Sequence, residues 1–171
     1  VNRMSDLFFV MARFAQAPFA ATASRTRDLL AATPLHQAHE LDWGECVTFA
    51  GPKGSLEIEA IEVNHWGRRW PSELERGYNG YVLRREGKSI LFAADTAMTP
   101  LFREQHRAKG PFDIGIMPIG AYNPWIRNHC NPEQAVQLAN DARARYLVPV
   151  HHQTFRLSDE PMDEPIQRFA E

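Results

Sequence analysis

Apolar and polar residues alternate along several short stretches after residue 40, as they do in half-buried β-strands. In the stretch 56–63, Leu56, Ile58 and Ala60 would face a core while Glu57 and Glu59 face away. The alternation slips after Ala60, which indicates either a bulge or a strand end that is covered on both faces. Shorter runs predict further strands over 46–50, 80–84, 89–93, 114–117 and 146–150, and the last two are continuously apolar, as in buried strands.

Turn and cap residues place the connections between these elements. Gly51-Pro52-Lys53-Gly54 and Glu86-Gly87-Lys88 are typical of hairpin turns. Asn131 followed by Pro132 predicts a helix start, and Ala135, Leu138, Ala139 and Ala142 would form its apolar face. A terminal helix is predicted over 165–170. Hairpins followed by a strand–helix–strand order predict an α/β fold, with a mixed sheet and helices on one face.

The first 33 residues have a different composition, with eight alanines, four arginines and no glycine. A short helix could begin at Ser5, with Leu7, Val10, Met11 and Phe14 on one face, and end at Pro18. A second helix is predicted over 24–32. Residues 1–33 are therefore expected to be an atypical helical preamble, and residues 34–171 to form the domain proper.

Composition and charge exclude several classes of protein. The 171 residues carry 19 basic and 21 acidic side chains, for a net charge of −2, which argues against a nucleic-acid partner. No apolar run approaches the roughly 18 residues of a membrane span. The two cysteines, Cys46 and Cys130, are too few for a disulfide scaffold, and free thiols predict a reducing, cytoplasmic location.

Three residues with metal-ligating side chains follow predicted strands. His65 follows the stretch 56–63, Asp95 follows 89–93, and His151 follows 146–150. Strand ends are rigid platforms, and imidazole nitrogen and carboxylate oxygen are both ligands of zinc. Their positions alone support a metal site only as a hypothesis, because a single histidine or aspartate at a strand end is usually structural.

A series of short motifs strengthens that hypothesis. They are Asn64-His65-Trp66-Gly67-Arg68-Arg69, Phe92-Ala93-Ala94-Asp95-Thr96, Gly110-Pro111-Phe112-Asp113, Pro118-Ile119-Gly120-Ala121-Tyr122, His129 with Asn131-Pro132-Glu133-Gln134, and Val150-His151 with Thr154-Phe155. In this order they resemble the metallo-β-lactamase superfamily, and more closely its branch containing N-acylphosphatidylethanolamine-hydrolysing phospholipase D. The resemblance covers about Pro34 to the C-terminus and implies the C-terminal half of an αββα sandwich.

The resemblance also implies a site and a chemistry. His65 would correspond to a ligand of a first zinc ion, Asp95 to the carboxylate that bridges two zinc ions, and His151 to a ligand of the second. Asp95 and His129 would be catalytic, and Tyr122 and His129 would lie near the substrate. The implied activity is a zinc-dependent hydrolase, attacking a phosphodiester with a metal-bound hydroxide in the manner of a phospholipase D. A lactonase of the same fold is the alternative enzyme.

Two departures from the family pattern limit this expectation. The family motif His-x-His-x-Asp-His is absent, so only His65, Asp95 and His151 match the seven residues of the two-zinc site, and one zinc ion or none is expected. In addition, His152-Gln153 stand where the family usually has tryptophan and glycine. An inactive truncated remnant, or a half-domain that needs a partner, is therefore the alternative to an enzyme. The expected substrate is a small-molecule or lipid phosphodiester, and peripheral membrane contact and homo-oligomer formation are left open.

Overall fold

A computed structural model describes residues 10–14, 17–33, 35, 37–51, 54–67 and 75–171. The chain divides into two compact units, one formed by residues 1–62 with 66–88 and the other by 63–65 with 89–171. Four sequence-based expectations lie outside the described residues: the helix start at 5–9, Pro52-Lys53 of the first turn, Pro34 at the predicted domain boundary and Arg68-Arg69 of the first motif.

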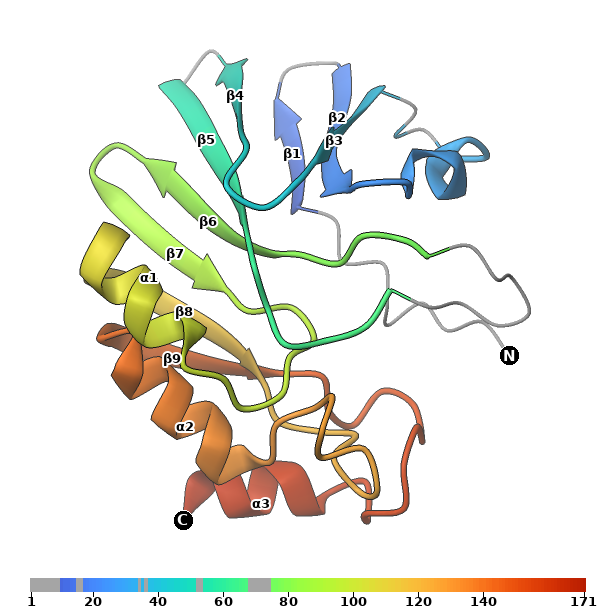
Figure 1. Cartoon of the computed structure of the whole chain (residues 1–171), viewed down its shortest axis with the longest axis vertical. Coiled ribbons are helices and arrows are strands. Elements are labelled where there is room, and N and C mark those ends of the chain that lie inside the picture. Colours follow the sequence, from blue (N-terminus) through green and yellow to red (C-terminus); the bar gives the residue numbers. More distant parts are fainter. Residues whose placement is uncertain (1–9, 15–16, 34, 36, 52–53, 68–74) are drawn as a thin grey trace. The chain divides into compact units, whose positions relative to one another are not determined.

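The first unit begins with a small sheet where helices were predicted. Its strands are β1 (Val10–Phe14), β2 (Ala17–Ala23) and β3 (Gln37–Leu41) (Figure 1). β1 pairs antiparallel with β2, and β2 pairs parallel with β3. The predicted helix ending near Pro18 is therefore wrong over its described part, and the second is only the 3₁₀ helix Arg27–Leu30. Helix propensity is a weak preference, and here pairing with the neighbouring strand β2 overrides it.

The family-like part of this unit follows the predicted pattern closely. β4 (Cys46–Gly51), β5 (Gly54–Ile61) and β6 (Gly80–Arg85) form an antiparallel meander. The pairing of β5 with β6 continues without a bulge to its last residue, Ile61, which faces Gly80. Residues 58–61 are all buried, so the slip in alternation reflects a strand end covered on both faces.

The second unit is a parallel sheet packed against helices. Its strands are β7 (Lys88–Phe92), β8 (Phe112–Pro118) and β9 (Ala144–Val150), with β8 between the other two. Helix α2 (Pro132–Asp141) packs against β8 and β9 and contacts both α1 (Leu101–Lys109) and α3 (Glu164–Ala170) (Figure 1). The predicted mixed α/β fold is confirmed.

Local signals placed α2 more reliably than α1. The side chain of Asn131 accepts a hydrogen bond from the Gln134 backbone amide, and the Gln134 side chain accepts one from the Asn131 backbone amide, which makes a complete capping box. The predicted apolar face of α2 is buried. Helix α1 was not predicted, although Thr99-Pro100 directly before it is a recognisable start signal.

Strand β9 is more exposed than its sequence predicts. Its continuous apolar run predicted a buried strand, yet Tyr146 and Val148 are 59% and 42% exposed. Among the described strands β9 is the last in its sheet, so it has a neighbouring strand, β8, along one edge only. The Arg145 guanidinium lies 5.3 Å from the centre of the Tyr146 ring and covers part of it. Among the described residues, no helix is both long enough and apolar enough to cross a membrane.

Candidate metal centre

Four metal-ligating side chains meet inside the second unit. His65 follows β5, Asp95 follows β7, and His151 directly follows β9. His129 comes from the loop between β8 and α2. The strand ends and the helix start hold these side chains on rigid backbone, as a preorganised site requires.

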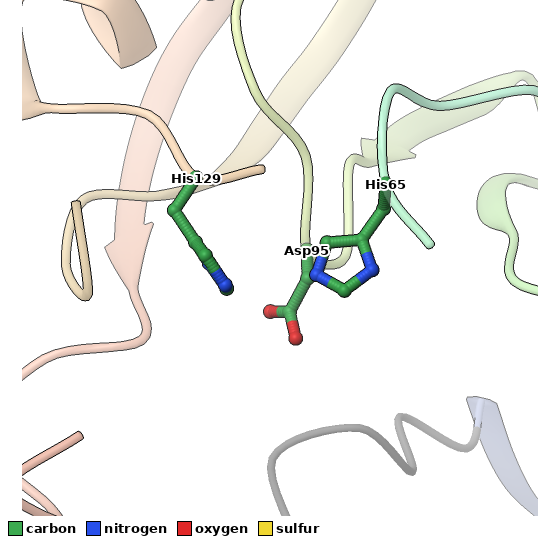
Figure 2. Close-up of side chains that lie close together, drawn as sticks. All are labelled: His65, Asp95 and His129. Carbon is green, nitrogen blue, oxygen red and sulfur yellow. The ribbon is translucent and has the colours of Figure 1, made fainter. Parts of the chain in front are cut away.

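The side chains converge closely enough to share a metal ion. One ligand atom each from His65, Asp95 and His129 lies within 4.8 Å of the others, and Figure 2 shows the three side chains turned toward a common point. Nε2 of His151 lies 3.2 Å from Oδ1 of Asp95. The His129 ring centre is 5.1 Å from those of His65 and His151. The structure therefore brings together every residue predicted as a metal ligand, with His129 as a fourth.

Burial and hydrogen bonding test whether a metal ion suits this cluster. Asp95 is only 7% exposed. Its Oδ1 and the Nδ1 of His129 are buried, and within the described residues neither has a hydrogen-bond partner. Buried polar atoms of this kind are costly unless something satisfies them. Two ligands of one tetrahedral zinc ion, each bound at about 2.0–2.1 Å, stand roughly 3.3 Å apart. The contact between Asp95 and His151 matches that spacing, so the donor set fits a zinc-like ion.

Three residues in or next to the cluster adopt a backbone conformation that side chains disfavour. The φ angles of Ala94, Ala121 and His151 are 53°, 62° and 61°. Residues other than glycine are uncommon in this left-handed region, and each costs on the order of 1 kcal/mol. Ala94 precedes Asp95, and His151 is itself in the cluster. Such strain persists where the surrounding structure imposes it, and it concentrates at functional sites.

Gly120 allows the β8 loop to touch the backbone of His151. A Cβ atom at Gly120 would lie 2.2 Å from the His151 carbonyl oxygen, far closer than any such pair can approach. The Ile119 amide donates a 3.0 Å hydrogen bond to the Val150 carbonyl and holds the two segments together. The close approach of these two backbone segments therefore requires glycine at position 120.

Burial also sets the charge state of His129. It lowers the pKa of His129 to about 4, against a smaller opposing effect of the Asp95 carboxylate. At neutral pH His129 is therefore the uncharged imidazole. A neutral imidazole retains a lone pair, which a metal ion or a hydrogen-bond donor can use.

Tyr122 uses its polar groups within the protein. Its hydroxyl donates a 2.6 Å hydrogen bond to Glu164 and accepts one of 3.0 Å from Arg168, both on α3. The buried Glu160 carboxylate accepts hydrogen bonds from the backbone amides of Tyr122 and Asn123. Burial, and next the bond to Glu164, raise the pKa of Tyr122 above its usual value. These contacts account for Tyr122 structurally, and its contact with substrate stays a prediction.

Replacing Tyr122 with phenylalanine tests this structural role. The change removes a partly buried hydroxyl and leaves Glu164 and Arg168 paired with each other at 3.0 Å. We expect the free energy of unfolding to fall by about 1 kcal/mol and the melting temperature by about 2–4 °C. Zinc affinity, measured by calorimetry, should not change. The matched control is Tyr146→Phe, because the side chain of Tyr146 is exposed. An unchanged melting temperature would contradict the structural role.

Sequence reasoning found most of this cluster because strand ends are recognisable in sequence. His129 was placed near the substrate, and its approach to the other three side chains was not foreseen. It lies in a loop, and no local pattern distinguishes a loop histidine that faces a metal site from one that faces solvent.

The mixed α/β fold, with Asp95 and His151 just beyond the ends of parallel strands, is that of a metallo-β-lactamase-type domain. Residues 8–152 match the family described as "Beta-lactamase superfamily domain". Because this match covers most of the chain, the chain belongs to that family. The match begins at residue 8, although the division of the chain at residue 33 remains a prediction.

Individual relatives agree with this assignment. An uncharacterised protein of Mycobacterium tuberculosis is 32% identical over 140 residues, covering 80% of this chain and 37% of that protein. The N-acyl-phosphatidylethanolamine-hydrolyzing phospholipase D 1 of Caenorhabditis elegans is 32% identical over 121 residues, covering 68% and 34%. The chain thus spans little more than a third of these relatives. A solved metallo hydrolase of Ignicoccus hospitalis shares the fold, with a TM-score of 0.63 and 19% identity, covering 88% of this chain and 60% of that one.

Proposed function

We propose that this chain carries part of the active site of a zinc-dependent hydrolase that cleaves phosphodiesters. The observation that supports it best is the convergence of the Asp95 carboxylate with the imidazoles of His65, His129 and His151. His65, Asp95 and His151 would hold the ion, and a bound zinc ion would supply a Lewis acid and activate water near neutral pH. The phosphodiester as substrate class rests on the phospholipase D relative.

The protein's own residues would contribute position and charge. Asp95 supplies the single negative charge of the cluster and is fixed by the end of β7. His129, uncharged because it is buried, would orient a phosphoryl oxygen of the substrate through a hydrogen bond from its ring. Asp95 is buried and His129 is half-buried, which limits their contact with bulk water and strengthens electrostatic interactions in the site.

A metal-binding half-domain without activity of its own is the second candidate. It is favoured by one observation, the absence of His-x-His-x-Asp-His from the 171 residues. The described cluster offers one carboxylate and three imidazoles, enough for one metal ion. A lactonase of the same fold is a weaker candidate, because the named phospholipase D relative favours a phosphodiester. A cytoplasmic location and the absence of a nucleic-acid partner remain predictions from composition.

Zinc titration and a hydrolysis assay together separate these functions. The metal-free chain should bind one equivalent of zinc by calorimetry, because the described residues offer one full set of ligands. Hydrolysis of bis(p-nitrophenyl) phosphate by the zinc-loaded chain should be measurable but weak. The control is His39→Ala, since His39 is exposed and contacts Phe49 in the first unit. Failure to bind zinc would refute the metal centre, whereas one bound zinc without hydrolysis would favour the inactive half-domain. Cleavage of a lactone but not of the phosphodiester would identify the lactonase.

A further inference from the structure

Thr96, directly after Asp95, is completely buried and contacts the chain on either side of the cluster. Its Oγ1 accepts a 3.0 Å hydrogen bond from the backbone amide of Asn64 and donates one of 3.0 Å to the Ala97 carbonyl. Asn64 is the residue before His65. The Thr96 hydroxyl therefore joins the segment that carries Asp95 to the segment that carries His65.

Two further hydrogen bonds reinforce this junction. The Ala97 amide donates to the Asn64 carbonyl at 2.8 Å, and the Asn64 side-chain amide donates to the Met98 carbonyl at 3.2 Å. Four hydrogen bonds thus surround the junction, and three of them fasten the residue before His65 to residues 96–98. Only one of the four joins the Thr96 side chain to the neighbouring segment: the Asn64 amide donates it to Thr96 Oγ1.

The backbone carbonyl of Thr96 extends the junction to His129. It accepts a 3.1 Å hydrogen bond from the thiol of Cys130, which is completely buried and directly follows His129. Asn131, the next residue, caps α2, so Cys130 is held between the Thr96 junction and a rigid helix start.

We infer that Thr96 is a positioning residue that sets the relative placement of His65, Asp95 and His129. Hydrogen bonds at Thr96 join the chain neighbours of these three residues, which are Asn64, Thr96 itself and Cys130. Thr96 is not proposed as a ligand, because its hydroxyl is already used by Asn64 and Ala97. Groups that orient metal ligands commonly change metal affinity by about 10–100-fold when removed. The role of this junction in metal binding rests on the proposed function.

The test compares Thr96→Val with Thr96→Ser in the full chain. Valine keeps the shape and removes the hydroxyl, whereas serine keeps the hydroxyl. We expect Thr96→Val to weaken zinc binding about 10-fold or more and to alter the visible spectrum of the cobalt-substituted chain. Thr96→Ser should restore both properties to near their original values. The matched control is Thr99→Val, because Thr99 is also buried and its hydroxyl accepts a hydrogen bond from Leu101 at the start of α1. That variant should lose stability without a change in the cobalt spectrum.

A second readout does not depend on metal binding. In the metal-free chain, NMR signals of the His65 ring should shift in Thr96→Val, which loses the hydrogen bond from Asn64, and stay in place in Thr99→Val. Cys130→Ala removes only the thiol contact and should shift the His129 signals while leaving those of His65 unchanged. Unchanged ring signals and cobalt spectrum in folded Thr96→Val would overturn the inference. If the unaltered chain binds no metal, the proposed function fails, while the ring signals still decide the role of Thr96.

Discussion

Asp95→Asn is expected to weaken zinc binding by about 100-fold or more. Asp95 supplies the cluster's only carboxylate, and its Oδ1 lies 3.2 Å from Nε2 of His151. An amide has nearly the same size but no charge, so the change removes a metal ligand without creating a cavity. Loss of an orienting partner alone costs about 10–100-fold in affinity, and loss of a charged ligand should exceed this.

The metal-free Asp95→Asn chain should be no less stable than the unaltered chain. A buried carboxylate whose Oδ1 has no hydrogen-bond partner in the described part of the chain is costly to the folded state. Zinc affinity would be measured by calorimetry, and thermal unfolding by circular dichroism with and without zinc. Asp141→Asn is the matched control, since Asp141 pairs with Arg103 at 3.0 Å and lies outside the cluster. Zinc binding within about threefold of the unaltered chain would show that Asp95 is not a ligand.

Gly120→Ala should have the second-largest effect, on both stability and metal binding. The new methyl group would meet the His151 carbonyl oxygen at 2.2 Å, so the β8 loop or the end of β9 must move. Overpacking of this kind typically costs about 1–3 kcal/mol. Because His151 directly follows β9 and already has a φ of 61°, any such movement also displaces its imidazole. We expect zinc affinity to fall about 10-fold, as when an orienting group is lost.

Gly115→Ala, in strand β8, provides the control for Gly120→Ala, in the loop that follows β8. Its methyl group would meet the Ala144 Cβ at 3.0 Å, which a small backbone shift relieves, and the flexible end of Met117 at 3.3 Å. That variant should lose less stability and keep its zinc affinity. Urea unfolding and zinc calorimetry of both variants make the comparison. Equal zinc affinity in the two variants would contradict the proposed link between Gly120 and His151.

The proposed site has one carboxylate and three imidazoles, fewer groups than the seven-residue family pattern that the sequence resembles. The four side chains nevertheless converge within the second unit, which includes residues 63–65 directly after β5. The junction at Thr96 explains how this convergence is maintained by the buried residues beside the ligands. Metal binding and hydrolysis are therefore separable questions for this chain, and the experiments above address each of them.

The sequence alone determined the elements whose signals are local. The Asn131 capping box and the spacing of Ala135 and Leu138 define α2, because a helix end satisfies its backbone groups within a few residues. Alternation over 56–60 and the continuous run 114–117 define β5 and β8 in the same way. The positions of His65, Asp95 and His151 after strands also follow from local pattern, which is why they could be nominated as ligands.

Tertiary structure decided whatever depends on partners that are distant in the sequence. Residues 17–23 form a strand because residues 37–41 pair with them, despite an alanine content that favours a helix. Tyr146 is exposed on β9, which among the described strands is the last of its sheet. His129 lies in the cluster beside Cys130, whose thiol donates a hydrogen bond to the backbone carbonyl of Thr96, 34 residues earlier in the chain. Hydrogen bonds and packing between distant segments determine which side chains meet. Local sequence periodicity does not reveal these long-range contacts.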